Sequence, residues 1–142
     1  MLAHQTKRRA RERALEYLFG LEATGYEWED GLAVFWETFS TNEKARAYAE
    51  LLIEGVYAQR EDLDAQIDSA LKGWSPARVG RVERIILRIG LYEMTSVEDV
   101  PPKVAINEAI EVTKLYAMDE SPKFVNGVLN RLKDSDLHES AG

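Results

Sequence analysis

The chain has 142 residues, a formal net charge of −7 and no cysteine. It is long enough to bury a core, and it can form neither a disulfide nor a thiolate zinc site. No apolar run approaches the ~20 residues of a membrane span, and the start of the chain lacks the apolar stretch of a signal peptide. His4 and His138 have no partner at metal-ligand spacing and should lie in solvent. We therefore expect a soluble, cytoplasmic protein with no metal and no other cofactor.

The first 13 residues are basic although the chain as a whole is acidic. They carry five cations and one acid, a charge of +4, so the rest of the chain must carry −11 to reach the total of −7. Positive potential at a helix start is typical of nucleic-acid contact, and a solvated terminus is the alternative. The cations of this basic arm are Lys7, Arg8, Arg9, Arg11 and Arg13.

Helical periodicity dominates the sequence, and no segment shows the alternation of a strand. The helix boundaries follow from local signals: Thr24-Gly25 ends the first helix, a Ser40-to-Glu43 capping box opens the third, and Ser75-Pro76 opens the fifth. The pattern predicts one all-α domain over residues 1–142, with residues 1–6 and 134–142 flexible. The expected helices span about 8–23, 28–39, 40–57, 60–71, 77–95, 102–116 and 121–133.

The fifth expected helix carries apolar side chains around most of its circumference, which predicts a central position. Glu93 falls on its apolar side with no second acid at hand, so we expect a structural hydrogen bond or a helix cap rather than catalysis. The chain also lacks a glycine-rich phosphate loop, a G-x-S-x-G elbow and an H-E-x-x-H motif. The sequence thus predicts a protein without enzymatic activity.

Phe19 lies roughly opposite the centre of the apolar stripe of the first helix, at ~100° per residue. Arg8 and Leu15 share its side of the helix. Two interpretations stay open at this stage. Phe19 either packs against another helix of a two-layered fold, or it stacks on RNA bases beside arginines that bind phosphate.

The last expected helix has a similar combination at its start. Phe124 stands at the edge of the apolar stripe with Lys123 and Arg131 nearby and Gly127 between them. A glycine inside a helix costs ~1 kcal/mol against alanine, so we expect it to mark the close approach of another backbone or a ligand. The helix start after Ser121-Pro122 also offers free amides for a phosphate. Core packing of Phe124 remains the alternative to a role in RNA binding.

Four segments resemble the NusB family of bacterial transcription antitermination factors. They are KRRARE at 7–12, ERIILRIGLYE at 83–93, VPPKVAINEAIE at 100–111 and SPKFVNGVL at 121–129. The resemblance implies seven helices in two small antiparallel bundles. It also implies binding to boxA RNA of ribosomal RNA transcripts together with NusE, a ribosomal protein of the small subunit. Further Nus factors and RNA polymerase would complete the antitermination complex.

The resemblance also implies site residues. Glu83 and its neighbours would contact NusE, and some family members form homodimers that hide the RNA surface. Two other readings remain: a helical adaptor that binds only proteins, and an RNA-engaging domain of an RNA cytosine methyltransferase, which a chain that stops at residue 142 makes less expected. The residues implied to bind RNA are Lys7, Arg8, Arg9, Arg11, Phe19, Lys123 and Phe124.

Overall fold

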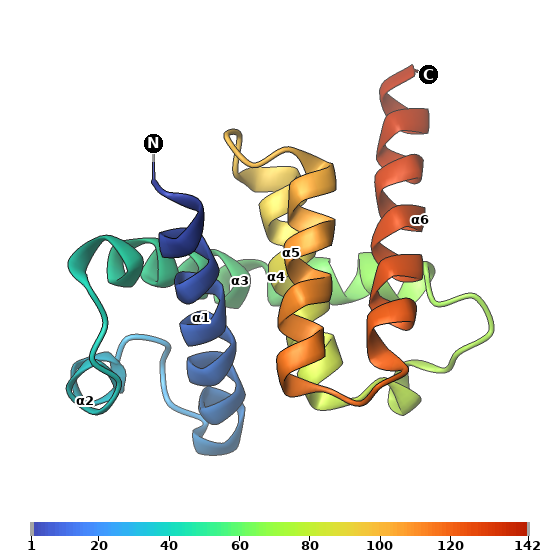
Figure 1. Cartoon of the computed structure of the whole chain (residues 1–142). Helices are drawn as coiled ribbons and strands as arrows, with labels where there is room; N and C mark the ends of the chain where they lie inside the picture. Colours follow the sequence, from blue (N-terminus) through green and yellow to red (C-terminus); the bar gives the residue numbers. More distant parts are fainter. Residues whose placement is uncertain (1, 142) are drawn as a thin grey trace. The chain divides into compact units, whose positions relative to one another are not determined.

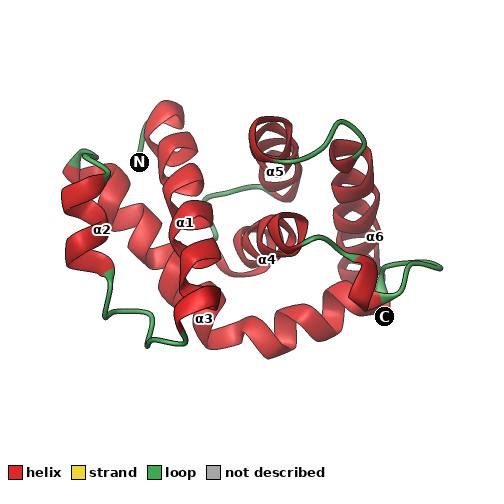
Figure 2. Ribbon diagram, turned by 90° about the horizontal axis from the view of Figure 1, so that it is seen from below, coloured by secondary structure: helices red, strands yellow, loops and turns green. Residues whose placement is uncertain are grey.

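The structure, a computed structural model, describes the backbone of residues 2–141 and the side chains of residues 2–135. The described residues form helices and no strand, which confirms the all-α class (Figure 1; Figure 2). His138 lies outside the described side chains. None of the described helices has the length and apolar character that crossing a membrane requires. The helices are α1 (His4–Thr24), α2 (Leu32–Thr38), α3 (Glu43–Ser69), the 3₁₀ helix η1 (Pro76–Arg78), α4 (Arg81–Ser96), α5 (Pro102–Tyr116) and α6 (Ser121–Ala141).

The chain divides into two compact units, Met1–Ala58 and Gln59–Gly142. The first unit contains α1, α2 and the N-terminal part of α3, and the second contains the remaining helices. One helix, α3, runs through the boundary. Two helical units in one chain agree with the two bundles that the family resemblance implies.

The helix α3 corrects two of the sequence predictions. The helices expected at 40–57 and 60–71 are one continuous helix, because no glycine or proline interrupts the chain between them. The Ser40 capping box is also wrong. The N-terminal cap is Asn42, whose Oδ1 accepts a hydrogen bond from the amide of Ala45 at 2.9 Å.

Other boundaries differ from expectation as well, and the first helix begins at His4 rather than near residue 8. Ser75-Pro76 opens only the short helix η1, because Val79 and Gly80 are extended and α4 starts after them. The second helix is shorter than predicted, since turns occupy residues 28–31. The last helix continues past Lys133 to Ala141. The flexibility expected of residues 1–6 and 134–142 stays a prediction.

In the first unit, α1 packs through its predicted apolar stripe. Ala10, Ala14 and Leu18 are buried, and Gly25 ends the helix in the left-handed conformation with φ of 71°. Tyr17 joins α1 to the segment before α2, because its hydroxyl donates to the carbonyl of Trp28 and accepts from the amide of Gly31. Leu15 is buried as well, which was not expected of the side that carries Phe19.

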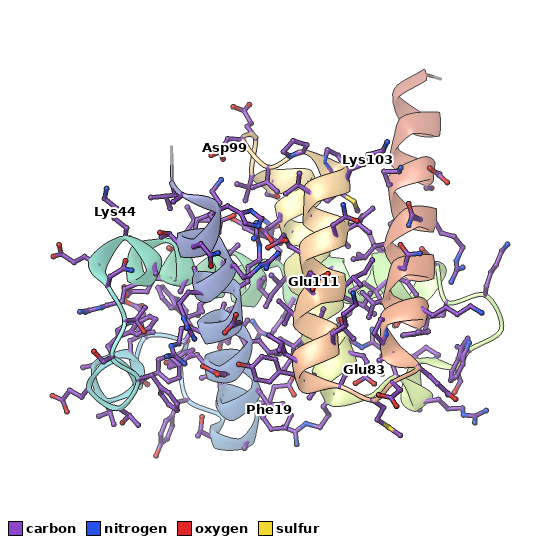
Figure 3. The ribbon with its side chains drawn as sticks, viewed as in Figure 1. Phe19, Lys44, Glu83, Asp99, Lys103 and Glu111 are labelled. Atoms are coloured by element: carbon purple, nitrogen blue, oxygen red, sulfur yellow. The ribbon has the colours of Figure 1, made fainter. Side chains whose placement is uncertain are left out.

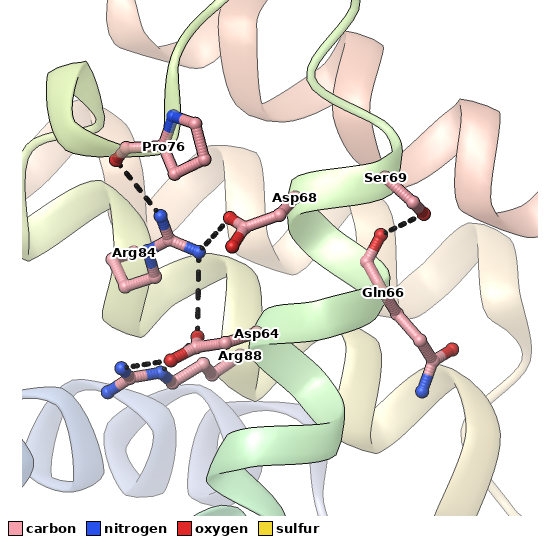
Figure 4. Close-up of polar contacts among 7 residues, drawn as sticks. All are labelled: Asp64, Gln66, Asp68, Ser69, Pro76, Arg84 and Arg88. Carbon is pink, nitrogen blue, oxygen red and sulfur yellow. Dashed lines mark hydrogen bonds and ion pairs between the residues drawn. The ribbon is translucent and has the colours of Figure 1, made fainter.

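In the second unit, α4 packs against both α5 and α6, and the burial of Ile85, Leu87 and Leu91 agrees with the prediction that this helix is packed on several sides. Gly90 permits the close approach, since a Cβ atom there would lie 2.9 Å from Leu129 Cδ1 and 3.4 Å from Ala109 Cβ. Ion pairs link α4 to the end of α3 (Figure 4). Arg88 binds Asp64 through two bonds of 2.8 Å, and Arg84 binds Asp68 at 2.7 Å.

Candidate nucleic-acid interface

An aromatic pair lies at the start of α6, and the sequence analysis identified only one of its members, Phe124. The rings of Trp74 and Phe124 lie 5.4 Å apart with an interplanar angle of 58°. The guanidinium of Arg78 lies over the Trp74 ring at 5.6 Å. Trp74 is 50% exposed although its side chain is large and apolar. A tryptophan held in this way offers stacking surface to a ligand.

Two hollows of about 200 and 270 Å³ meet at this pair and share Trp74, Glu120 and Phe124 as lining residues. Arg78 lines the smaller hollow, and Lys123 and Arg131 line the larger one. Stacking surface and cations therefore converge at one place. We call this set, made of Trp74, Arg78, Lys123, Phe124 and Arg131, the aromatic–basic cluster.

The backbone before η1 explains how Trp74 reaches this position. Lys72 and Gly73 both adopt positive φ, at 46° and 88°, so the chain reverses directly after Leu71. The amide of Trp74 then donates to the carbonyl of Leu71 at 3.4 Å. Sequence reasoning missed Trp74. The signal available in the sequence was Lys72-Gly73-Trp74, in which an aromatic residue directly follows a glycine that can reverse the chain direction.

Gly127 has an identifiable structural role. A Cβ atom there would lie 3.3 Å from the Arg131 Nη1 atom, so the glycine leaves room for the guanidinium of the next turn. Arg131 in turn donates from Nε to the carbonyl of Ala70 at 2.8 Å. Gly127 was expected to mark the close approach of another backbone or a ligand, but the group that approaches it is a side chain of its own helix.

Glu83 lies at the start of α4, beside the start of α6 (Figure 3). Its Oε2 atom accepts a hydrogen bond from Ser121 Oγ at 2.9 Å, and its side chain lines the smaller hollow. The carboxylate thus helps to fix the first residue of α6. Whether Glu83 also contacts NusE stays a prediction.

The basic arm forms the first turns of α1, but its cations differ in exposure. Arg9 is exposed and bonds Glu12 at 3.2 Å, and Arg8 is half-buried. Lys7 is buried with its Nζ 5.5 Å from the centre of the Tyr48 ring, and Arg11 is only 2% exposed. Of the four arm residues implied to bind RNA, the structure thus exposes Arg9, half-buries Arg8 and buries Lys7 and Arg11. Arg13 is engaged as well, since it bonds Glu16 at 2.8 Å and Thr41 Oγ1 at 3.0 Å.

Phe19 is 38% exposed, which agrees with its predicted position away from the apolar stripe of α1 (Figure 3). It belongs to the first unit together with the basic arm. Lys123, Phe124 and Glu83 belong to the second unit. The structure therefore groups the predicted site residues by unit, and it adds Trp74, Arg78 and Arg131 to the second group.

This chain is similar to known proteins over most of its length. The profile of the NusB family matches residues 8–134. The transcription antitermination protein NusB of Syntrophus aciditrophicus is 38% identical over 126 residues, which covers 89% of this chain and 78% of that protein. The corresponding protein of Trichlorobacter lovleyi is 42% identical over 127 residues, which covers 89% of each chain. A crystal structure of antitermination factors NusB and NusE in complex with dsRNA superposes with a TM-score of 0.82 at 26% identity, covering 94% of this chain and 99% of that one.

Proposed function

Because the chain belongs to the NusB family, we propose that it is a transcription antitermination factor that binds boxA RNA together with NusE. In this role the pair helps to assemble the antitermination complex on RNA polymerase. The protein acts by binding and carries out no reaction of its own. It binds nascent transcripts in the cytoplasm.

The observation that carries the proposal is the aromatic–basic cluster at the start of α6. Sequence-specific RNA recognition favours single strands, whose bases stack on aromatic rings while cations meet the phosphates. Trp74 and Phe124 supply the rings, and Arg78 and Lys123 supply charge beside them. The same segment, SPKFVNGVL, is among the most specific parts of the family resemblance.

In the first unit we assign the phosphate contacts to Arg8 and Arg9 and a stacking contact to Phe19. Exposure supports this choice, because Arg9 and Phe19 are exposed whereas Lys7 and Arg11 are buried. Lys7 and Arg11 then support the helix that presents the other two. Glu83 remains a proposed NusE contact, and its bond to Ser121 gives it a part in fixing the start of α6.

Fluorescence anisotropy with labelled RNA tests the proposal directly. We expect the protein to bind a boxA oligonucleotide more tightly than a scrambled one, and NusE to increase that preference. Equal affinity for both sequences, with and without NusE, would contradict the proposal and favour an adaptor that binds only proteins. Sedimentation over a range of protein concentrations, without and with RNA, shows in parallel whether the protein forms a homodimer and whether that homodimer competes with RNA binding.

A further inference from the structure

The first unit contains an apolar groove that the proposed function does not use. Its volume is about 560 Å³, and α1, α2 and the segment between them supply its lining. Leu21, Phe35 and Phe39 form part of the walls, and Tyr26 and Val34 stand at positions that are exposed. Val34 is 66% exposed, although it is one of the side chains that folding would normally bury. Grooves of this size and character hold apolar groups of a ligand or partner.

The stretch of chain that supplies the groove lining contains acids and no base. No lysine or arginine occurs between Arg13 and Lys44, so every charged side chain in that stretch is an acid. Two of these acids, Glu16 and Asp30, line the groove itself. The cation at its edge, Arg13, already bonds Glu16 at 2.8 Å and lies 5.3 Å from the Phe39 ring. The acids of the stretch are Glu16, Glu22, Glu27, Glu29, Asp30, Glu37 and Glu43.

An apolar trough with an acidic border selects a particular ligand chemistry. RNA fits this site poorly, because its phosphates would meet the carboxylates of Glu16 and Asp30, and Arg13 is already paired with Glu16. A small apolar molecule would use the walls but gain nothing from the acids. A basic amphipathic helix satisfies both features, since its apolar face enters the groove at i, i+3, i+4 and i+7 spacing while its lysines or arginines meet the border.

We propose that the α1–α2 groove is a docking site for a basic amphipathic helix of a partner protein. Charge complementarity carries the choice of partner, and the exposed apolar border at Tyr26 and Val34 provides the contact surface. The lining residues of the groove belong to the first unit, and the aromatic–basic cluster belongs to the second. The lining also includes none of Arg8, Arg9 and Phe19, the proposed RNA contacts of the first unit, so partner docking and RNA binding use different residues.

The first test maps the site on the full-length protein by NMR. The probe is a helical peptide of leucines at i, i+3, i+4 and i+7 spacing with lysines at the other positions. We expect its titration to shift the amide signals of Gly20, Gly31 and Val34, which line the groove. Two further peptides replace every lysine by glutamine or by glutamate. The glutamine peptide should bind at least tenfold more weakly, and the glutamate peptide should not bind.

Variants then separate the groove from general attraction to an acidic protein. Val34→Asp should weaken binding of the lysine peptide at least tenfold, whereas Leu115→Asp, at a residue that is 67% exposed and outside the groove, should leave it unchanged. Both variants should keep the thermal unfolding temperature and the RNA affinity of the parent. Glu29→Lys with Glu37→Lys should also weaken the lysine peptide.

Four results would overturn the proposal. Shifts spread over all acidic segments would show unspecific charge attraction. Equal binding of the glutamine peptide would show an apolar pocket without charge selection. Unchanged affinity in Val34→Asp would place the peptide elsewhere. Concentration-dependent dimerisation that Val34→Asp abolishes would make a second copy of this chain the occupant.

Discussion

Phe124 is half-buried against Trp74 and also lines both hollows of the aromatic–basic cluster. Phe124→Leu keeps most of the apolar volume but removes the flat ring. We expect the substitution to weaken boxA binding by ~1–2 kcal/mol, about 5- to 30-fold, with little change in the thermal unfolding temperature. RNA titration and thermal unfolding monitored by circular dichroism check both parts.

Two further variants accompany Phe124→Leu: Trp74→Leu is a parallel test of stacking, and Tyr26→Leu is the control. Trp74→Leu should weaken RNA binding to a similar degree, because it removes the other ring of the pair. Tyr26→Leu should not, since this exposed aromatic lies in the other unit, at the α1–α2 groove. A collapse of stability in Phe124→Leu, with normal RNA affinity of the folded fraction, would make Phe124 a core residue only.

Arg9 and Arg11 are near neighbours on α1 but differ in burial, and the two alanine variants should differ accordingly. Arg9→Ala should weaken boxA and scrambled RNA alike and reduce the slope of log affinity against log salt by about 0.7, the loss of one phosphate contact. Arg11→Ala should instead lower the free energy of unfolding by about 3 kcal/mol, because the substitution removes the contacts that this buried cation makes inside the protein. Salt titrations and urea unfolding separate the two. The reverse pattern would return Arg11 to the phosphate contacts.

At the scale of helices, two glycines predict opposite effects of the same substitution. Gly90→Ala adds a methyl group 2.9 Å from Leu129 Cδ1 in the buried contact of α4, α5 and α6, so we expect a loss of ~1–3 kcal/mol. Gly20→Ala meets nothing within 4 Å on α1 and should gain ~0.5–1 kcal/mol through helix propensity. Urea unfolding measures both. A stabilised Gly90→Ala would show that the core accommodates the methyl group.

Tyr17 tests the connection between α1 and α2. Burial, the largest effect, raises the pKa of Tyr17 above its ordinary value of 10.0, and the nearby acids Asp30 and Glu50 act in the same direction. The folded protein thus keeps Tyr17 neutral at a pH where the unfolded chain ionises it, so its contribution to stability is complete below about pH 10 and is lost above that value.

Tyr17→Phe should therefore cost ~1–2 kcal/mol near pH 8, because the substitution leaves Trp28 and Gly31 without their hydrogen-bond partner. The difference between the variant and the parent should narrow as the pH rises above 10. Urea unfolding at several pH values measures it, with the exposed Tyr26→Phe as the control. A difference that stays constant with pH would contradict the raised pKa.

At the scale of the whole molecule, charge is divided along the chain. The net charge is −7, yet the first 13 residues carry +4. Such a division lets an RNA and a basic protein bind different surfaces without competing. We expect NusE and boxA RNA to bind with positive coupling of ~1–3 kcal/mol, so that RNA raises NusE affinity by the same factor by which NusE raises RNA affinity.

Titrations of each ligand in the absence and presence of the other, at two salt concentrations, measure this coupling. Higher salt should weaken the affinity for RNA more than it weakens the coupling between RNA and NusE, since phosphate contacts dominate the salt dependence. Competition between the two ligands would show that they share a surface and would contradict the division of charge.

The sequence alone determined the class of the fold and the positions of several helix ends. The bounds predicted for α5, 102–116, are those of the structure, because two prolines open the helix and local signals suffice there. The basic arm and the Lys123-Phe124 pair were also visible, since charge and aromatic type are local properties. The two helices predicted in place of α3 were wrong, because a helix continues through polar residues where no glycine or proline interrupts it.

Only the tertiary structure decided which of these residues act together. Trp74 joins Phe124 across 50 positions of sequence, and no periodicity within one helix reports a contact between a loop and another helix. The burial of Arg11 beside the exposed Arg9 likewise depends on what packs against α1, which the sequence of α1 does not contain. Helical periodicity states which side of a helix is apolar, whereas packing with distant segments decides which polar and aromatic side chains remain at the surface.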